Sequence, residues 1–308
     1  MARSDGLRLV SGRAVATLEN PNMLGEYLVL LLPLALYAAL HAESAKSRFF
    51  GVVSFVSMVA CLGLSFSRGA WVAAAAAFLF YMILDRRSFW PLVLTAAILV
   101  PLVLWVLPDD FFLRLTTLSD SSVLYRVHIW EGTLLLLRDF FWGGIGVGYA
   151  AWQKIYPTYA LEAIEQAPHA HSLPLTLLVE IGVFGLLVFA AVMFLFMQSQ
   201  NRFRIETKRM ASISDEPGTD TFASLRAASS ALGAGIFGSL VFGLFDHAWY
   251  NYRVYLMFWL ILGLASATAR TGRAAMARRR EADLPAENTT RSAAVDFTAV
   301  PSGDQERM

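Results

Sequence analysis

Long apolar runs separated by short charged clusters are the feature of this chain that most restricts its fold. Only 16% of the residues are charged and 56% are hydrophobic, whereas an ordinary soluble domain has roughly 25% charged residues. So little polar surface cannot cover a soluble globule of 308 residues. Apolar segments set apart by charged ones are typical of helices that cross a bilayer. The sequence therefore predicts an all-α, polytopic membrane protein.

The apolar segments predict about seven transmembrane helices of roughly 17–25 residues each. They lie near 23–40, 49–66, 70–84, 89–107, 172–197, 227–245 and 249–268. We expect an external leader at 1–22, four membrane helices within 23–107, a long loop at 108–171, three membrane helices within 172–268, and a basic and then disordered tail at 269–308.

Lysine and arginine are distributed unevenly around these segments, and their excess marks the cytoplasmic side. Four basic clusters fall on one side, at 46–48, 86–87, 202–209 and 270–280. The loop 108–171 is then expected on the external face of a bacterial plasma membrane. The basic leader would also be external, which is unusual without an earlier span, so we expect the chain to be the C-terminal portion of a longer protein.

Composition and charge exclude one class of binding partner, nucleic acids. The net charge is +1, and no basic stripe occurs away from the flanks of the spans, which argues against nucleic-acid binding. The single cysteine, Cys61, lies within an apolar run and is expected to be a small buried side chain.

Two histidines stand just before the predicted helix at 172–197. His169 and His171 precede Leu173 and Pro174, and proline favours the first turn of a helix. The positive end of the helix dipole disfavours a charged imidazole at His171, so a neutral ring can accept a proton. His171 is therefore a candidate general base, although two loop histidines without a chemical role are the simpler alternative.

Arginine at two positions of the external face suggests phosphate binding, because a guanidinium presents a planar fork of donors. Arg68 lies in a Ser-Arg-Gly turn, outside the cytoplasmic rim, and Gly69 permits close approach to the backbone. Arg126 lies one helical turn before Trp130, so the two side chains are expected on the same side. Membrane anchoring and an interfacial helix are the alternatives.

The helix that carries Arg126 is expected to begin near Ser122, with Asp120 or Ser121 as its cap, and to end at Gly143-Gly144. Its apolar residues recur at helical spacing, at Val123, Val127, Trp130, Leu134 and Leu137.

Several other polar residues are weaker candidates. Glu180 lies about two turns inside its span, and Asp246 and Arg253 flank the last external turn. His169 and His171 could join His128 or Asp246 and His247 around a metal, but the spacing matches no recognised site, so no metal is expected. The glycines at 143–148 follow no strand, so they are expected to form a tight loop and to bind no nucleotide cofactor.

The chain resembles the O-antigen ligase and polymerase superfamily in the order and spacing of seven segments. They lie at 17–25, 65–71, 125–130, 142–148, 169–172, 180–182 and 243–253. Members of this superfamily are integral membrane glycosyltransferases that act on undecaprenyl-pyrophosphate-linked glycans. The resemblance implies that Arg68 and Arg126 hold the pyrophosphate and that His171 activates the acceptor hydroxyl. Where the family usually has Asn after this histidine, the chain has Ser172.

The function implied by the resemblance is transfer of a glycan from the lipid donor to an acceptor hydroxyl on the external face. The acceptor is a glycan, a lipid or a protein, and the sequence does not separate ligase from polymerase. The alternatives are a transporter or flippase-like module for lipid-linked or anionic substrates and a non-catalytic assembly partner. A transporter is expected to show paired broken helices around a site at the membrane midplane.

Overall fold

The computed structural model describes residues 9–10, 13–85, 121–161, 164–213 and 219–282, together with the single residues 90, 93, 94, 97 and 101. These residues are helical apart from loops and one short antiparallel ladder, in which β1 (Leu9–Val10) pairs with β2 (Arg13–Ala14). The all-α, polytopic fold is confirmed. Several predicted parts lie outside the described residues: most of the expected span at 89–107, the start of the expected loop with its cap Asp120, and the tail beyond 282. Residues 214–218, between the spans at 172–197 and 227–245, also lie outside them.

Six apolar helices correspond to six of the predicted spans. Five of them are long and apolar enough to cross a membrane: α1 (Pro21–His41), α2 (Ala45–Leu64), α8 (Leu173–Ile213), α9 (Thr219–Gly243) and α10 (Tyr252–Ala282). The sixth, α3 (Arg68–Leu84), has 17 residues and is the span that the sequence predicts to be short. α8 and α10 extend well beyond their predicted ends, since the basic segments that follow the apolar runs continue as helix.

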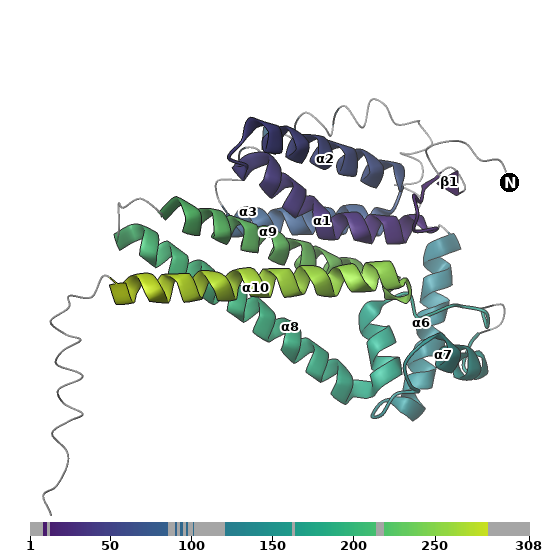
Figure 1. Ribbon diagram of the computed structural model, residues 1–308. Helices are drawn as coiled ribbons and strands as arrows, with labels where there is room; N and C mark the ends of the chain where they lie inside the picture. The colour runs from purple at the N-terminus through teal and green to yellow at the C-terminus, as the bar shows by residue number, and fades with distance from the viewer. Residues whose placement is uncertain are drawn as a thin grey trace, which may run out of the picture.

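α1 and α9 form the centre of the bundle (Figure 1). α1 packs against α2, α3 and α9, and α9 packs in addition against α8 and α10. Gly25 allows α1 to approach α3 closely, because a Cβ at this position would lie 2.5 Å from the Cβ of Ala70. This contact brings the N-terminal ends of α1 and α3 together.

The predicted helix at 172–197 is not continuous, because α8 is broken at Gly182, and Figure 1 shows the sharp bend. Gly182 has φ 67°, which an L side chain rarely adopts. The glycine loop at 143–148 occupies the break: Ile145 N–H donates to Val179 O at 2.7 Å, and Gly146 N–H donates to Glu180 O at 3.1 Å. The tight loop predicted at these glycines is therefore present, and it satisfies backbone groups that the break leaves open.

The segment between the two groups of membrane helices is a folded unit at one end of the bundle (Figure 1). It contains α6 (Ser121–Phe140), α7 (Tyr149–Ile155) and the 3₁₀ helix η2 (Tyr156–Thr158). α6 confirms the predicted helix. Val127 and Leu134 of its expected apolar face are exposed, whereas Ile129 and Leu136 are buried. The buried face packs against Trp152, Tyr156 and the histidine segment, which the periodicity of α6 alone does not reveal.

The orientation of the bundle in the membrane is testable by cysteine labelling. If the lysine and arginine asymmetry marks the cytoplasmic side, Ala160→Cys should react with an impermeant thiol reagent in intact cells, and Met210→Cys should not. Both variants should be made with Cys61 replaced by alanine, because Cys61 is a free thiol. Labelling at position 210 and protection at position 160 would contradict the assignment of the external face.

Candidate active site

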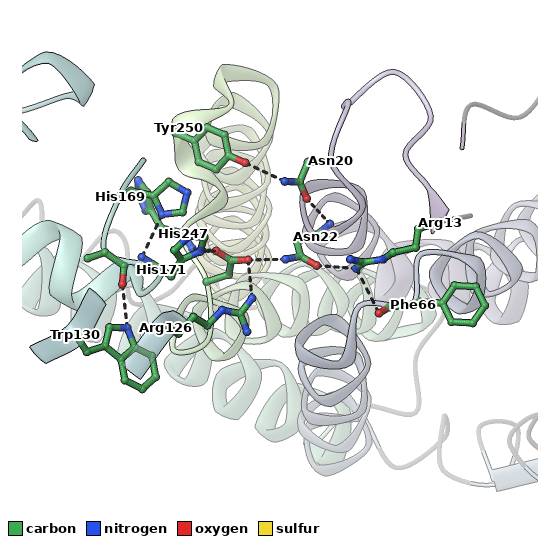
Figure 2. A network of polar contacts seen from close by, with 12 residues as sticks. Arg13, Asn20, Asn22, Phe66, Arg126, Trp130, His169, His171, His247 and Tyr250 are labelled. Atoms are coloured by element: carbon green, nitrogen blue, oxygen red, sulfur yellow. Dashed lines mark hydrogen bonds and ion pairs between the residues drawn. The ribbon is translucent and has the colours of Figure 1, made fainter. Parts of the chain in front are cut away.

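Polar residues from distant parts of the chain converge at the end of the bundle that carries α6 (Figure 2). They come from the N-terminal segment before α1, the turn between α2 and α3, α6, the histidine segment before α8, and the turn after α9. Five of the sequence candidates lie among them, together with two asparagines that the residue types alone do not single out: Arg126, Trp130, His169, His171 and Asp246, with Asn20 and Asn22.

Asp246 is the centre of this arrangement and is 5% exposed. Its Oδ1 lies 2.9 Å from Nδ1 of His171 and accepts the backbone N–H of His247 at 2.8 Å. Its Oδ2 accepts the side-chain amide of Asn22 at 2.7 Å and a guanidinium N–H of Arg126 at 3.3 Å. One buried carboxylate thus joins the candidate base and one candidate phosphate-binding arginine.

The charge of Asp246 determines the tautomer of His171. Burial acts to raise the pKa of Asp246, but its contacts with His171 and Arg126 outweigh burial and hold the pKa well below its ordinary value. The carboxylate is therefore ionised and can only accept hydrogen bonds. Nδ1 of His171 must then carry the proton in this contact, which leaves Nε2 of the neutral ring with a lone pair. This is the tautomer that a general base needs.

The backbone at His171 is held in an unusual conformation, with φ 47° in a non-glycine residue. Trp130 supports the preceding residue, because its indole N–H donates to Ala170 O at 2.9 Å. The backbone N–H of His171 donates to Nδ1 of His169 at 3.1 Å, and the ring of Tyr125 packs edge-on against His171 at 5.9 Å. Trp130, His169 and Tyr125 therefore position the His171 ring.

His169 and His247 of the cluster are neutral near neutral pH. Burial, assisted by the neighbouring His171 and His247, lowers the pKa of His169 to about 3. Burial also lowers the pKa of His247 to about 4, against the opposing effect of Asp246. His169 and His247 therefore add no positive charge near neutral pH, whereas the guanidinium of Arg126 contacts the carboxylate as a cation.

Arg68 is the first residue of α3 and is half-buried. The next residue, Gly69, lies against the turn after α9, since a Cβ on Gly69 would lie 3.5 Å from the Cβ of Phe245. Because Asp246 follows Phe245, the helix that Arg68 opens begins beside the turn that carries the carboxylate.

Three of the weaker candidates are not part of the Asp246 cluster. Glu180 accepts the backbone N–H of Gly148 at 3.0 Å and so holds the glycine loop against the break in α8. Arg253 is exposed and contacts Thr17 O and the Tyr252 hydroxyl. His128 is exposed on α6, whereas the next residue, Ile129, is buried.

The N-terminal segment supplies residues that sequence reasoning did not assign to the site. Asn22 links Asp246 to Arg13, whose guanidinium donates to Asn22 Oδ1 at 3.0 Å and to Ser65 O at 2.8 Å. Asn20 caps α1 through Asn22 N–H and donates to the Tyr250 hydroxyl at 3.3 Å. The segment Asn20-Pro21-Asn22 could have indicated these residues. Asn20 and Pro21 are typical of a helix start, and this start places the side-chain amide of Asn22 in the first turn of the helix.

A metal ion is an alternative occupant of this cluster, because His169, His171 and Asp246 offer donor atoms within 4.8 Å of one another. Two of these atoms already have hydrogen-bond partners: Nδ1 of His171 pairs with Asp246, and Nδ1 of His169 accepts the His171 N–H. These hydrogen bonds occupy one ring nitrogen of each histidine.

Residues 53–190 match the family model described as O-antigen ligase. This match supports the resemblance of the chain to the O-antigen ligase and polymerase superfamily. The matched segment includes Arg68, Arg126 and His171, whereas Asn22 and Asp246 lie outside it. Among curated proteins, none matches the chain. The family match and the five long apolar helices together support a multi-pass membrane protein with a domain similar to O-antigen ligase.

Proposed function

We propose that this protein transfers a glycan from an undecaprenyl-pyrophosphate donor to an acceptor hydroxyl on the external face of the membrane. The observation that carries the proposal is the buried Asp246 carboxylate, which contacts both His171 and Arg126. A proton acceptor and a phosphate-binding cation are thereby held on one rigid group, as transfer from a sugar pyrophosphate requires.

The reaction needs two events at neighbouring atoms. Nε2 of His171 takes the proton of the acceptor hydroxyl, and the hydroxyl oxygen forms a bond to the anomeric carbon of the donor sugar. The bond between that carbon and the pyrophosphate oxygen breaks, and its electron pair leaves with the pyrophosphate. Asp246 accepts a hydrogen bond from Nδ1–H throughout and stabilises the imidazolium that forms.

Arginine charge is required where the leaving group gains charge. Arg126 uses one guanidinium nitrogen for Asp246 and is 27% exposed, so further N–H donors of its fork can reach a phosphate. Arg68, at the start of α3, is a further arginine at this end of the bundle. We propose that the two hold the pyrophosphate together.

An apolar groove next to the site suits the lipid chain of such a donor. The groove measures about 620 Å³ and runs between α1 and α10, with walls that include Leu24, Leu28, Leu256 and Leu260. At its polar end are Thr17 and Arg253, close in sequence to Asn20 and Tyr250 of the site. An isoprenoid chain in this groove would lead directly to the Asp246 cluster.

The transporter alternative is less well supported. A broken helix is a feature of transporter sites, and α8 is broken at Gly182. The glycine loop fills this break with backbone hydrogen bonds, so the freed carbonyls of Val179 and Glu180 have no room for a substrate. The polar cluster lies instead at the end of the bundle.

Substitution of Arg68 tests the proposed role in pyrophosphate binding. Arg68→Lys keeps the charge but loses the planar fork, so we expect transfer to fall by about tenfold or more. The assay should follow polyprenyl pyrophosphate release and glycan attachment with the full-length protein in membranes. Arg138→Lys is the matched control, because Arg138 is exposed on α6 at the same end of the bundle. Equal activity of both variants would assign Arg68 to membrane anchoring, and no transfer by the wild-type protein would contradict the proposed function.

A further inference from the structure

A second cavity lies at the opposite end of the helix bundle from the Asp246 cluster. It measures about 360 Å³ and is formed by the C-terminal end of α3, the middle of α8 and the N-terminal half of α9. Arg226, on the α9 side, is separated from the end of that helix at Gly243 by a helical length of about 25 Å. The cavity is therefore distinct from the proposed active site.

Its wall is apolar on one side and polar on the other. Phe80, Leu84, Phe194 and Met197 supply the apolar part. The polar part consists of amide, guanidinium and hydroxyl groups from α8 and α9: Gln200, Asn201, Arg204, Arg226, Ser229 and Ser230. A ligand that fits both sides has an apolar chain and a polar head.

Two donors in this wall lack a partner within the part of the chain that the structure describes. They are Nε of Arg204 and the amide nitrogen of Gln200, and both atoms are buried. The other amide atom of Gln200, its oxygen, accepts the hydroxyl of Ser229, so the nitrogen is the end of the side chain left unused. Buried donors without an acceptor are costly, which indicates that an acceptor group binds here.

The surroundings of the cavity favour an anion. Arg204 and Arg226 line it, and Arg202, Lys208 and Arg209 lie nearby in sequence on α8. All of these residues except Arg226 belong to the cluster at 202–209, which marks the expected cytoplasmic rim. Basic pockets between helices on that side suit anionic lipid head groups. An anionic head group also supplies the oxygen acceptors that Arg204 and Gln200 lack.

We propose that this cavity binds one anionic phospholipid of the cytoplasmic leaflet. The phosphate accepts hydrogen bonds from Arg204 and Gln200, and an acyl chain lies along Phe194 and Phe80. The bound lipid joins α3, α8 and α9 at the end of the bundle away from the catalytic groups. This site does not depend on the proposed glycan transfer.

Binding can be measured by native mass spectrometry of the detergent-solubilised full-length protein, titrated with phosphatidylglycerol or phosphatidylcholine. We expect phosphatidylglycerol to be retained preferentially. Arg204→Gln should weaken its binding by about tenfold, because a charge-assisted hydrogen bond to a buried group is lost. Arg202→Gln is the matched control, since Arg202 is exposed two residues away and carries the same charge. Equal loss in both variants would reduce the effect to general surface charge and overturn the proposal.

A second variant fills the cavity without removing any polar group. Gly233 lines the cavity, and a Cβ there would meet no atom within 4 Å, so Gly233→Leu should fold and exclude the acyl chain. Gly263→Leu, at an equally open position on α10 outside the cavity, is its control. Retained phosphatidylglycerol binding in Gly233→Leu would contradict the site. Displacement of the lipid by millimolar inorganic phosphate would show an anion site that does not select lipid, and would also overturn the proposal.

Discussion

Replacement of His171 by alanine is expected to lower the turnover of glycan transfer by roughly two to four orders of magnitude. The acceptor hydroxyl loses the group that takes its proton, while the arginines that hold the donor are unchanged. Binding of the lipid donor should therefore remain close to that of the wild-type protein. Turnover and donor affinity should be measured separately, with the full-length protein in membranes.

His128→Ala is the matched control for His171→Ala, because His128 is an exposed histidine of the same segment. Its turnover should stay within a fewfold of the wild-type value. A chelator is expected to leave wild-type transfer unchanged, since His169, His171 and Asp246 satisfy one another by hydrogen bonds. Loss of activity on chelation that added metal restores would show that the histidines hold a metal, and the general-base mechanism would be wrong.

Asp246→Asn is expected to lower turnover by about two to four orders of magnitude, as is found when the carboxylate that orients a catalytic histidine becomes an amide. Asparagine no longer requires Nδ1 of His171 to donate, so the ring can adopt the unproductive tautomer. Arg126 also loses its counter-ion at 3.3 Å. Turnover should be measured together with the thermal unfolding midpoint, which separates misplacement of His171 from loss of the fold.

The pH dependence of this variant provides an additional check. The folded pKa of Asp246 is lowered, so its ionisation stabilises the protein above the unfolded pKa of about 4, and the contribution is lost as the pH falls below that value. In Asp246→Asn this contribution is absent at every pH, so the difference in stability from wild type should shrink in acid.

Asp85→Asn is the matched control, because Asp85 is also buried and lies 3.7 Å from His41 at the opposite end of the bundle. It should change stability without the loss of turnover. If the two variants lose turnover in proportion to their loss of stability, Asp246 has only a structural role.

Local properties of the sequence account for much of this fold. Apolar length predicted six helices whose existence the structure confirms, because burial in a bilayer requires a continuous apolar stretch wherever the helix packs. The pairing of Arg126 with Trp130 on one side of α6 follows from helical geometry in the same way. The start of α8 at Leu173, with Pro174 in its first turn, was likewise predictable from the sequence.

The break in α8 at Gly182 could not be predicted from the local sequence. Apart from Glu180, the residues around it are apolar, and all of them are compatible with a helix. The glycine loop makes the interruption possible, because it approaches Val179 and Glu180. The same limit applies to the buried face of α6. That face is set by a packing partner between residues 152 and 170, and the periodicity of α6 carries no information about the partner.

The sequence by itself determined the class of protein, the helices, the superfamily resemblance and the residue types able to bind phosphate or accept a proton. Only the tertiary structure decided how these residues cooperate. His171 and Asp246 are separated by 75 residues, and Asn22 and Asp246 by 224, so no local pattern can pair them. Their contacts exist because packing of α1, α3, α6, α8 and α9 brings the ends of these helices to one place. Burial there makes the charge of Asp246 strong enough to determine which nitrogen of His171 carries the proton.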